Sequence, residues 1–314
     1  MLNVYWRPKG KIVEGKLDAL RSKKTTWVDC FNPTKKELED ISKLTGVPVI
    51  EFKEHLLSYE RPTTLEDDSF SLIVFGAPVM HKDRTVATSF AIFLCKNNNI
   101  ITIRTEEMEG ILKFKNDIIE KNYKRFDSVT KTVQLMLELI IDTYFEYMDN
   151  FHEQADKIEA AVFKKPQKRS IEDLFKVRKS VLFFHKALIA NREVLLAIEK
   201  QHVSRLTKKD LPEFRDLRDD VMQLIDTEDM LRTMLTGILD IYTSSLSNQL
   251  NQAMKKLTVI ASYVLIPTLI ASIYGMNFRF MPEIPWKWGY PVSLGMMIIS
   301  IVAVYFYFKK SKML

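Results

Sequence analysis

Carboxylates are concentrated between residues 210 and 240, where nine acidic side chains occur with only three arginines. Carboxylate oxygens are the ligands that hard divalent cations such as Mg²⁺ and Ca²⁺ prefer. A run of charge on a helix is, however, more often a solvated face, so the sequence leaves both interpretations open. The acids are Asp210, Glu213, Asp216, Asp219, Asp220, Asp226, Glu228, Asp229 and Asp240.

A second set of polar residues follows one face of an otherwise apolar stretch. Its members recur at intervals of three and four, which is the spacing of one side of an α-helix. Small and hydroxyl side chains on such a face mediate packing between membrane helices, and the same face can also line a path for ions. The residues are Asn251, Met254, Thr258, Ala261, Leu265, Thr268 and Ser272.

No catalytic constellation is visible in the sequence. There is no nucleophile with an adjacent base, no glycine-rich phosphate loop and no nucleic-acid-binding module, and only nine glycines occur. His152, His185 and His202 lie outside any HExxH or Cys/His pattern, so we interpret them as structural. Cys30 and Cys95 form no disulfide framework and fit a reduced cytosolic domain. We expect neither an enzyme nor a protein that binds nucleotide or nucleic acid.

Two uncharged apolar runs must position the polar face and its C-terminal end. They cover residues 257–274 and 292–308. A membrane-spanning helix needs about 17–25 predominantly apolar residues, so each run just reaches that length. Two lysine-bordered runs argue against a buried helix of a soluble protein. We therefore expect a transmembrane hairpin in a lipid bilayer.

Basic residues predict the orientation of this hairpin. Five lysines border the two runs on the side of the chain ends, whereas the connecting loop holds two bases and Glu283. Positively charged flanks stay on the cytoplasmic side. We therefore place the loop outside the cell and both termini in the cytoplasm.

The residues around the loop resemble those of a known transporter family. Tyr-Gly-Met-Asn-Phe occupies residues 274–278, Met-Pro-Glu occupies 281–283, and Gly-Tyr-Pro occupies 289–291 before the second run and a lysine-rich end. In this setting the chain resembles the CorA family of magnesium and cobalt transporters. The resemblance is sharp over about residues 210–314 and looser before them. It implies a homopentameric channel of the cytoplasmic membrane whose first span lines the pore.

The resemblance also implies roles for individual residues. Hydrophobic side chains at the inner end of the pore would form a constriction that gates by dewetting. Family members differ at the position of Leu265, so the width there is left open. Selectivity-filter positions are Gly275, Met276 and Asn277, and pore-lining or gate positions are Asn251, Met254, Leu257, Leu265 and Thr268.

Asparagine at a pore mouth suits a hydrated magnesium ion. Mg²⁺ releases its water reluctantly, and the Asn277 carbonyl oxygens can accept hydrogen bonds from that water without binding the ion as tightly as carboxylates. Glu283, present once per subunit, would attract cations to the entrance. An ordinary solvated loop acid is an equally good interpretation of Glu283.

Phe-Arg-Asp at residues 214–216 resembles the family segment whose aspartate binds Mg²⁺ between neighbouring subunits. Asp83, in an expected hairpin turn, is our candidate for the partner of Asp216. A bound cation would bridge carboxylates that otherwise repel and would favour the closed state. Mg²⁺ is thus expected both as the substrate and as a regulatory ligand.

The chain before the hairpin predicts an α+β cytosolic domain with a long helical stalk. We place the α/β domain at residues 1–125, the helical region at 126–255 with its stalk at about 210–255, and the membrane hairpin at 256–314. Strand patterns at 69–79, 85–95 and 100–104 are rich in β-branched and aromatic residues.

The expected stalk carries a heptad pattern in which Glu228 is the exception. Sustained heptads predict helices that pack around a shared axis, so we expect an oligomeric funnel. The pattern comprises Leu217, Val221, Leu224, Leu231, Leu235, Ile238 and Tyr242.

Two other functions stay open at this point. One is a Zn²⁺, Co²⁺ or Ni²⁺ transporter of the same superfamily, of the ZntB kind, although such relatives typically vary the Gly-Met-Asn triplet that this chain keeps. The other is a membrane-anchored scaffold without transport, which has no need of a polar stripe or a terminal asparagine. Uptake of divalent cations into cells separates the scaffold from the transporters.

Overall fold

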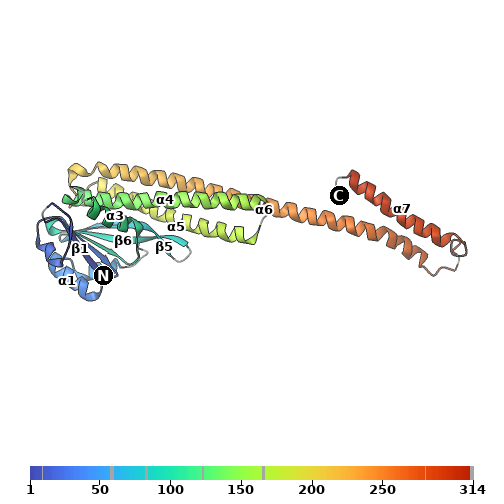
Figure 1. Ribbon diagram of the computed structural model, residues 1–314, viewed down its shortest axis with the longest axis horizontal. Helices are drawn as coiled ribbons and strands as arrows, with labels where there is room; N and C mark the ends of the chain where they lie inside the picture. Colours follow the sequence, from blue (N-terminus) through green and yellow to red (C-terminus); the bar gives the residue numbers. More distant parts are fainter. Residues whose placement is uncertain are drawn as a thin grey trace. The chain divides into compact units, whose positions relative to one another are not determined.

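The structure is a computed structural model. It describes residues 1–8, 10–56, 60–81, 84–121, 124–164, 167–279 and 281–311. The chain divides into two compact units, residues 1–239 and 240–314. Figure 1 labels their helices and strands.

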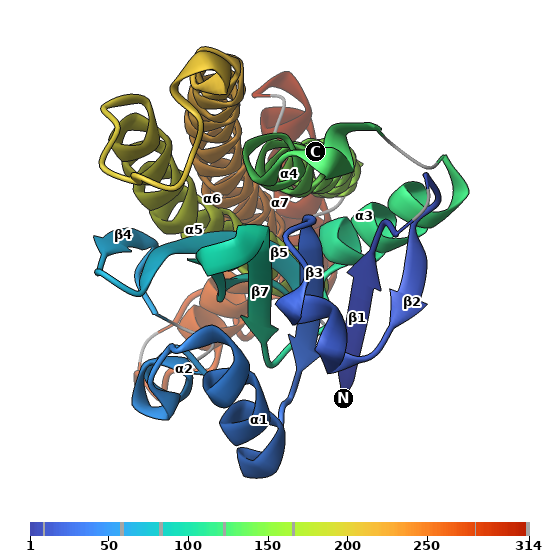
Figure 2. The same cartoon turned by 90° about the vertical axis from the view of Figure 1, so that its left-hand side faces the viewer.

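A seven-stranded sheet forms the core of the first unit, with the strand order β2-β1-β3-β7-β6-β5-β4 (Figure 2). Neighbouring described strands pair antiparallel, except for the parallel pair β3 and β7. The strands are β1 (Leu2–Trp6), β2 (Val13–Gly15), β3 (Thr26–Phe31), β4 (Thr63–Glu66), β5 (Phe70–His81), β6 (Arg84–Cys95) and β7 (Asn99–Arg104).

Seven α-helices accompany the described strands. Short 3₁₀ turns also occur at Leu17–Arg21, Lys96–Asn98, Lys124–Asp127 and Lys208–Asp210. The α-helices are α1 (Lys35–Thr45), α2 (Val49–Glu54), α3 (Glu109–Glu120), α4 (Val129–Lys164), α5 (Lys168–Glu199), α6 (Glu213–Tyr274) and α7 (Gly289–Lys310).

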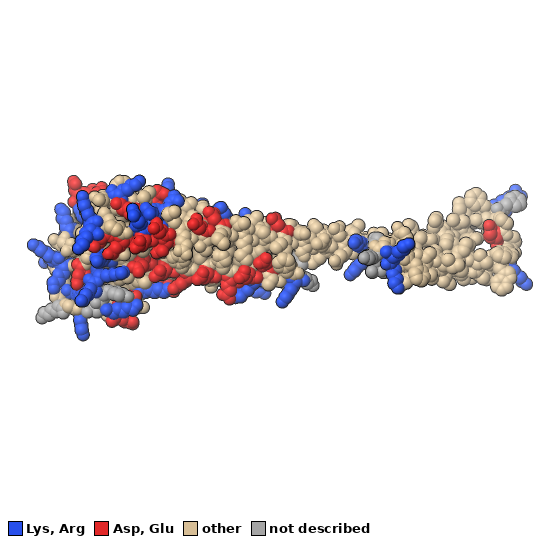
Figure 3. Space-filling model, turned by 90° about the horizontal axis from the view of Figure 1, so that it is seen from above, with Lys and Arg blue, Asp and Glu red and all other residues tan. Residues whose placement is uncertain are grey.

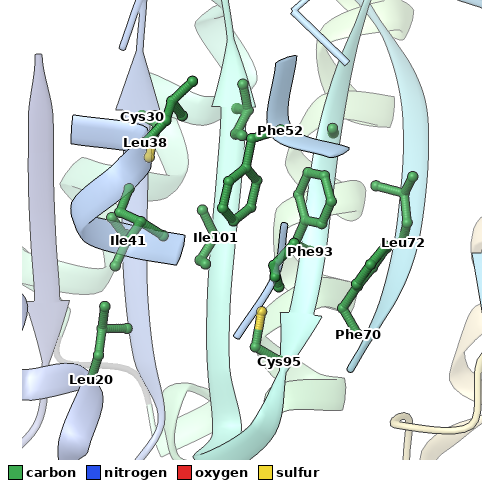
Figure 4. Close-up of a cluster of buried hydrophobic side chains, with 14 of the residues drawn as sticks. Leu20, Cys30, Leu38, Ile41, Phe52, Phe70, Leu72, Phe93, Cys95 and Ile101 are labelled. Carbon is green, nitrogen blue, oxygen red and sulfur yellow. The ribbon is translucent and has the colours of Figure 1, made fainter. Parts of the chain in front are cut away.

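Helices cover both faces of the sheet, which explains why β5, β6 and β7 are buried along almost their whole length. On one face, side chains from α1 and α2 meet alternate residues of the strands (Figure 4). Figure 4 shows Phe52 of α2 beside Phe93 of β6, and their ring centroids lie 4.8 Å apart. On the other face, α5 packs against β5 and β6, and α4 packs against β5.

Local signals place several of these elements as predicted. The Thr34 and Glu37 spacing predicts a capping box, and the two residues form it at the start of α1: the Thr34 N–H donates to Glu37 Oε2 at 2.7 Å, and the Glu37 N–H donates to Thr34 Oγ1 at 3.3 Å. Gly46 ends α1 in the left-handed conformation, with φ of 79°. Asn97 and Asn98, both with φ of 60°, make the turn between β6 and β7.

Three local features of the structure differ from what the sequence indicates. Strand β4 was not expected, because its Thr-Thr-Leu-Glu sequence is polar and largely exposed at the sheet edge. The Ser170 and Asp173 spacing predicts a helix cap at Ser170, but α5 already begins at Lys168, and Ser170 is buried inside its first turn. Asp210, followed by Pro212, predicts the cap of the last cytosolic helix, but α6 begins at Glu213, three residues further on. Asp83 lies outside the described residues.

Helices α4, α5 and α6 lie side by side in the first unit (Figures 1 and 2). Polar contacts join α6 to the other two: Lys131 Nζ lies 3.8 Å from Glu213 Oε1, and Arg218 Nη1 donates to Glu199 Oε2 at 2.7 Å. The heptad residues from Leu217 to Ile238 are buried in this packing. The heptad pattern therefore marks packing within the chain, and the shared axis between copies stays a prediction.

A buried ion pair ties two strands of the sheet together. Arg104 of β7 donates from Nη2 to Asp29 Oδ2 at 2.9 Å and from Nε to Asp29 Oδ1 at 3.1 Å. Both side chains are almost completely buried, and Thr102 also donates to Asp29 Oδ1 at 3.1 Å. Such a two-pronged geometry, with further hydrogen bonds, is what a buried pair needs to offset its desolvation.

An asparagine side chain extends the sheet where β4 ends. The pairing of β4 with β5 stops at Val74, and two residues later the Asn191 amide of α5 meets the backbone of Gly76. The Gly76 N–H donates to Asn191 Oδ1 at 2.8 Å, and Asn191 Nδ2 donates to the Gly76 carbonyl at 3.0 Å. A Cβ at position 76 would lie 3.2 Å from Ala187 Cβ, so glycine lets α5 approach the strand closely.

The second unit consists of the C-terminal part of α6, a loop and α7. A small cluster joins the helices, in which Val259 and Tyr263 of α6 pack with Val304 and Phe308 of α7. Both helices are long and apolar enough to cross a membrane, and only 6% and 17% of their most apolar windows are buried. The expected α+β domain, long helix and pair of C-terminal apolar helices are confirmed, whereas the oligomeric funnel and the three domain boundaries stay predictions.

Candidate functional site

The predicted pore positions of α6 share an exposed surface. Asn251, Met254, Leu257, Leu265 and Thr268 are all exposed in the second unit. They lie on the side of the helix away from α7. Thr268 follows the α7-packing residue Val259 by nine residues, which is two and a half turns at 3.6 residues per turn, and so points the opposite way.

Hydroxyl groups on this surface donate their hydrogen to the helix itself. Thr258 Oγ1 donates to the Met254 carbonyl at 2.9 Å, and Thr268 Oγ1 donates to the Val264 carbonyl at 2.7 Å. A hydroxyl oxygen that has donated its hydrogen keeps its lone pairs. The two threonines can therefore accept hydrogen bonds from water at the exposed surface.

The predicted selectivity residues lie where α6 ends. The Gly275 N–H donates to the Ala271 carbonyl at 2.9 Å, and the Met276 N–H donates to the Ile273 carbonyl at 3.2 Å, so the last turn tightens. A Cβ on Gly275 would lie 3.3 Å from the Ala271 oxygen. Asn277 follows this turn with an exposed side chain. Within the described part of the chain, nothing hydrogen-bonds to the Asn277 amide, which leaves its oxygen available to an incoming ligand.

The loop between the spans fixes the backbone of Glu283 and leaves its carboxylate in solvent. The Trp286 N–H donates to the Glu283 carbonyl at 3.3 Å, and the Gly289 N–H donates to the Trp286 carbonyl at 2.9 Å. A Cβ on Gly289 would lie 2.2 Å from the Glu283 oxygen, so only glycine fits this turn. The backbone of Glu283 is thus fixed within the loop that follows α6, and its negatively charged side chain faces solvent.

Asp216 lies in the first unit, exposed on the first turns of α6. Its neighbours are acidic. The pKa of Asp220 is raised, first by partial burial and then by the charges of Asp216, Asp219 and Glu138. The structure therefore gathers carboxylates from α4 and α6, and Figure 3 shows acidic side chains clustered over the helical part of this unit.

Asp142 of α4 belongs to the same acidic group. Its pKa is raised by partial burial and then by Glu138, Asp220 and Glu146. The sequence reasoning missed Asp142 and Glu138 as neighbours of Asp220. Their four-residue spacing along α4 was a usable signal, because it places them on one helix face, but nothing in the sequence paired that face with α6. The predicted partner Asp83 lies outside the described residues.

The chain matches a family model described as CorA-like Mg²⁺ transporter protein over residues 22–310. The cobalt/magnesium transport protein CorA of Methanocaldococcus jannaschii is 31% identical over 308 residues, which cover 96% of each chain. The cobalt/magnesium transport protein CorA of Thermotoga maritima is 29% identical over 96% of this chain and 87% of that protein.

Solved structures resemble the chain over nearly all its length. The complete structure of the CorA magnesium transporter from Methanocaldococcus jannaschii superposes with a TM-score of 0.88 at 29% identity, covering 99% of this chain and 98% of the other. The full-length CmaX protein matches with a TM-score of 0.76 at 12% identity over 98% of this chain and 96% of that one. The ZntB cytoplasmic domain from Vibrio parahaemolyticus matches at 0.64 and 11% over 78% of this chain and 98% of that one. The last two likenesses concern the fold alone.

Proposed function

Because the chain belongs to the CorA family of Mg²⁺ transporters, we propose that it carries hydrated Mg²⁺ through a pore lined by α6. Members of this family are membrane transporters and not enzymes, and the two apolar helices fit that role. Mg²⁺ is the transported substrate. The homopentamer, the route of the ion and its control belong to the proposal.

One observation carries the pore assignment. α7 packs on the Val259 and Tyr263 side of α6, and the opposite side, which includes Thr268, is exposed and partly polar. A helix that only anchors a protein has no reason to keep asparagine and threonine on an exposed side, because polar groups are costly against lipid. Copies of α6 arranged around an axis would turn this side toward water.

The available acceptors suit an ion that keeps its water. Mg²⁺ dehydrates reluctantly, and its bound water molecules donate hydrogen bonds outward. Asn277 offers a free amide oxygen, and Thr268 offers a hydroxyl oxygen whose hydrogen is already used. Neutral acceptors hold a hydrated divalent ion less tightly than carboxylates, and conduction needs an ion that also leaves.

The inner part of the same side is more apolar. Met254, Leu257 and Leu265 are exposed there in the single chain. A ring of such side chains excludes water when it closes, so it can gate by dewetting. We assign the gate to these three residues.

The driving force is the membrane potential, worth about 2.3 kcal/mol per elementary charge per 100 mV. The lysines that border the spans favour an orientation with both chain ends in the cytoplasm and Glu283 outside. The exposed Glu283 carboxylate would then raise the local concentration of cations beside Asn277.

Cytosolic Mg²⁺ closes the pore by binding at the acidic group around Asp216. Asp220 and Asp142 hold their protons more strongly than usual because of partial burial and neighbouring carboxylates, and a divalent cation would relieve that repulsion. The cation favours whichever state brings the acids together. When cytosolic Mg²⁺ falls, the sites empty and the closed state loses this stabilisation.

Flux into liposomes under an inside-negative potential tests the pore. We expect Mg²⁺ uptake with the wild-type protein and its loss in Asn277→Ala. The matched control is Asn248→Ala, since Asn248 is an exposed asparagine of α6 that lies about half a turn around the helix from Thr268. Equal flux in Asn277→Ala and wild type would remove Asn277 from the mechanism. Absence of flux from every variant, with folded protein, would favour the scaffold or another cation.

Substitution of Asp216 tests the regulation separately. Asp216→Lys is expected to abolish inhibition by internal Mg²⁺ while flux persists, because a cation at this position repels Mg²⁺. Asp226→Lys is the control, since Asp226 is an exposed acid of the same helix outside the acidic group. Inhibition that is unchanged in Asp216→Lys would contradict the proposal.

A second candidate is a transporter for Co²⁺, Ni²⁺ or Zn²⁺. The relatives named for cobalt as well as magnesium favour Co²⁺ as an alternative substrate. Competition in the same liposome assay gives the order of preference.

A further inference from the structure

We propose that His185, Glu228 and Asp229 form a binding site for a divalent transition metal, of the class of Co²⁺, Ni²⁺ or Zn²⁺, between α5 and α6. The site lies within the first unit and is separate from the acidic group at Asp216. The proposal concerns only metal binding between α5 and α6, so it can be tested independently of transport.

The geometry brings three ligand types to one point. His185 comes from α5, whereas Glu228 and Asp229 are consecutive residues of α6. His185 Nδ1 lies 2.6 Å from Glu228 Oε2. One ligand atom from each of the three residues can be chosen so that all lie within 4.8 Å of one another. A nitrogen and two carboxylates at this spacing match the ligand set of many Zn²⁺ and Co²⁺ sites.

Glu228 supplies the second observation. Its side chain is 0% exposed, and its oxygen Oε1 has no hydrogen-bond partner among the described residues. A buried carboxylate oxygen without a partner is costly. His185 satisfies only the other oxygen, Oε2. A metal ion at this point would engage the carboxylate that the protein alone leaves half satisfied.

The site also has an open side through which an ion can enter. The His185 side chain is partly exposed, and the Asp229 carboxylate is half exposed. Asp229 Oδ1 accepts a hydrogen bond from Arg232 at 2.8 Å, which orients the carboxylate. A site therefore exists with a buried floor at Glu228 and a solvent-facing rim at Asp229, where water can complete the coordination.

The imidazole selects the class of ion. Mg²⁺ takes oxygen ligands and keeps most of its water, whereas imidazole nitrogen suits Co²⁺, Ni²⁺ and Zn²⁺. Binding displaces the hydrogen now shared between His185 Nδ1 and Glu228 Oε2. With metal–ligand bonds of about 2.0–2.1 Å in tetrahedral geometry, the two atoms would sit about 3.3 Å apart, so the side chains separate by several tenths of an ångström.

Titration of the full-length protein in detergent with Co²⁺, in the presence of excess Mg²⁺, tests the site. Mg²⁺ saturates oxygen-only sites, so the remaining Co²⁺ binding reports sites with nitrogen. We expect tight binding with a visible Co²⁺ absorption band and a rise in Tm. His185→Gln is expected to weaken this binding by at least about tenfold, on the scale that metal-site substitutions produce, and to remove the rise in Tm.

Two further variants decide between a metal site and a simple hydrogen-bonded pair. His152→Gln is the control, because among the described residues the His152 ring hydrogen-bonds only to the Met148 carbonyl, at 3.3 Å, and this variant should bind Co²⁺ as the wild type does. Asp229→Asn removes the exposed ligand without disturbing the buried pair, and should also weaken Co²⁺ binding. If His185→Gln does not fold, the Asp229→Asn titration takes its place. Co²⁺ affinity equal to that of wild type in folded His185→Gln or Asp229→Asn, or displacement of Co²⁺ by Mg²⁺ at equal concentration, would overturn the proposal.

Discussion

The two units of the molecule differ in how far their apolar side chains are buried. In the first unit, large side chains such as Trp27, Phe93 and Phe184 are completely buried by the chain itself. In the second unit, Leu265 and Ile299 are 69% and 67% exposed. Only two of the forty acidic residues, Asp240 and Glu283, belong to the second unit.

This difference separates what the chain stabilises alone from what its surroundings must stabilise. The first unit has a closed core with buried ion pairs and hydrogen bonds, as a water-soluble domain does. The apolar surface of the second unit far exceeds the few hundred Å² that soluble monomers usually leave exposed. Lipid must cover part of it, and other copies of the chain must cover α6 if the pore assignment holds. The same substitution should therefore have different consequences in the two units.

The largest expected effect comes from the buried ion pair of the first unit. Asp29→Ala leaves the Arg104 guanidinium buried without its partner, so we expect the free energy of unfolding to fall by about 3–5 kcal/mol. Urea unfolding of the purified protein in detergent measures it. Asp18→Ala, at an exposed acid of the same unit, should change stability by less than about 0.5 kcal/mol. A similar loss of stability in both variants would mean that the buried ion pair contributes no more to the free energy of unfolding than an exposed acid does.

A lysine placed on an exposed apolar residue compares the units directly. Ile299 lies near the middle of α7 and Phe163 near the end of α4, and both are about two-thirds exposed. Ile299→Lys should cost about 3 kcal/mol of membrane insertion, whereas Phe163→Lys should shift stability by less than about 0.5 kcal/mol. The fraction of each variant in the membrane after expression is the measurement. Equal membrane fractions would show that Ile299 does not face lipid.

Loss of the two hydrogen bonds between the Asn191 amide and the Gly76 backbone should give a smaller effect within the first unit. Asn191→Ala leaves the N–H and carbonyl of Gly76 buried without their partner beyond the end of β4, which should cost about 1–3 kcal/mol. Asn150→Ala, at an exposed asparagine of α4, is the matched control for urea unfolding. If Asn191→Ala were as stable as Asn150→Ala, water would be able to replace the Asn191 amide as the hydrogen-bond partner of Gly76 without a loss of stability.

Much of the first unit could be predicted from the sequence because its signals are local. The capping box of Thr34 and Glu37 and the turn at Asn97 depend on residues a few positions apart. The long strands β5 and β6 could be predicted because their sequences are rich in β-branched and aromatic residues. Strand β4 could not be predicted in this way, since an exposed edge strand with polar residues lacks the apolar alternation on which the prediction relies.

What the sequence could not provide is the identity of partners far along the chain. The heptad pattern of α6 correctly marked a buried stripe from Leu217 to Ile238, but periodicity does not say whether the covering helix belongs to the same chain. Glu228 stood out as the exception in that stripe, and its explanation lies 43 residues away at His185. Glu138, which acts on Asp220, likewise comes from α4, far away along the chain. The pore positions stay predictions, because a single chain leaves their side of α6 uncovered.

The smallest expected effect is the pH dependence of the α1 cap, which belongs to the acid-rich unit. Hydrogen bonds from the Thr34 backbone and side chain lower the pKa of Glu37 below its usual value of 4.5. A lowered carboxyl pKa adds stability above the unfolded value, and that stability is lost as the pH falls through the folded value. Glu37→Gln keeps an acceptor for the Thr34 N–H without a titrating group. Between pH 5 and about 3, wild type should therefore lose up to about 1 kcal/mol relative to Glu37→Gln.

Urea unfolding at several pH values measures this difference, with Glu39→Gln as the control on the same helix. Glu39 lies in an exposed pair with Lys35, 3.8 Å apart, so its loss should matter little. The second unit contributes only two acidic side chains to acid titration, so a stronger pH dependence in the first unit sharpens the contrast between the two units. Parallel pH curves for wild type and Glu37→Gln would show that the cap gains nothing from its charge.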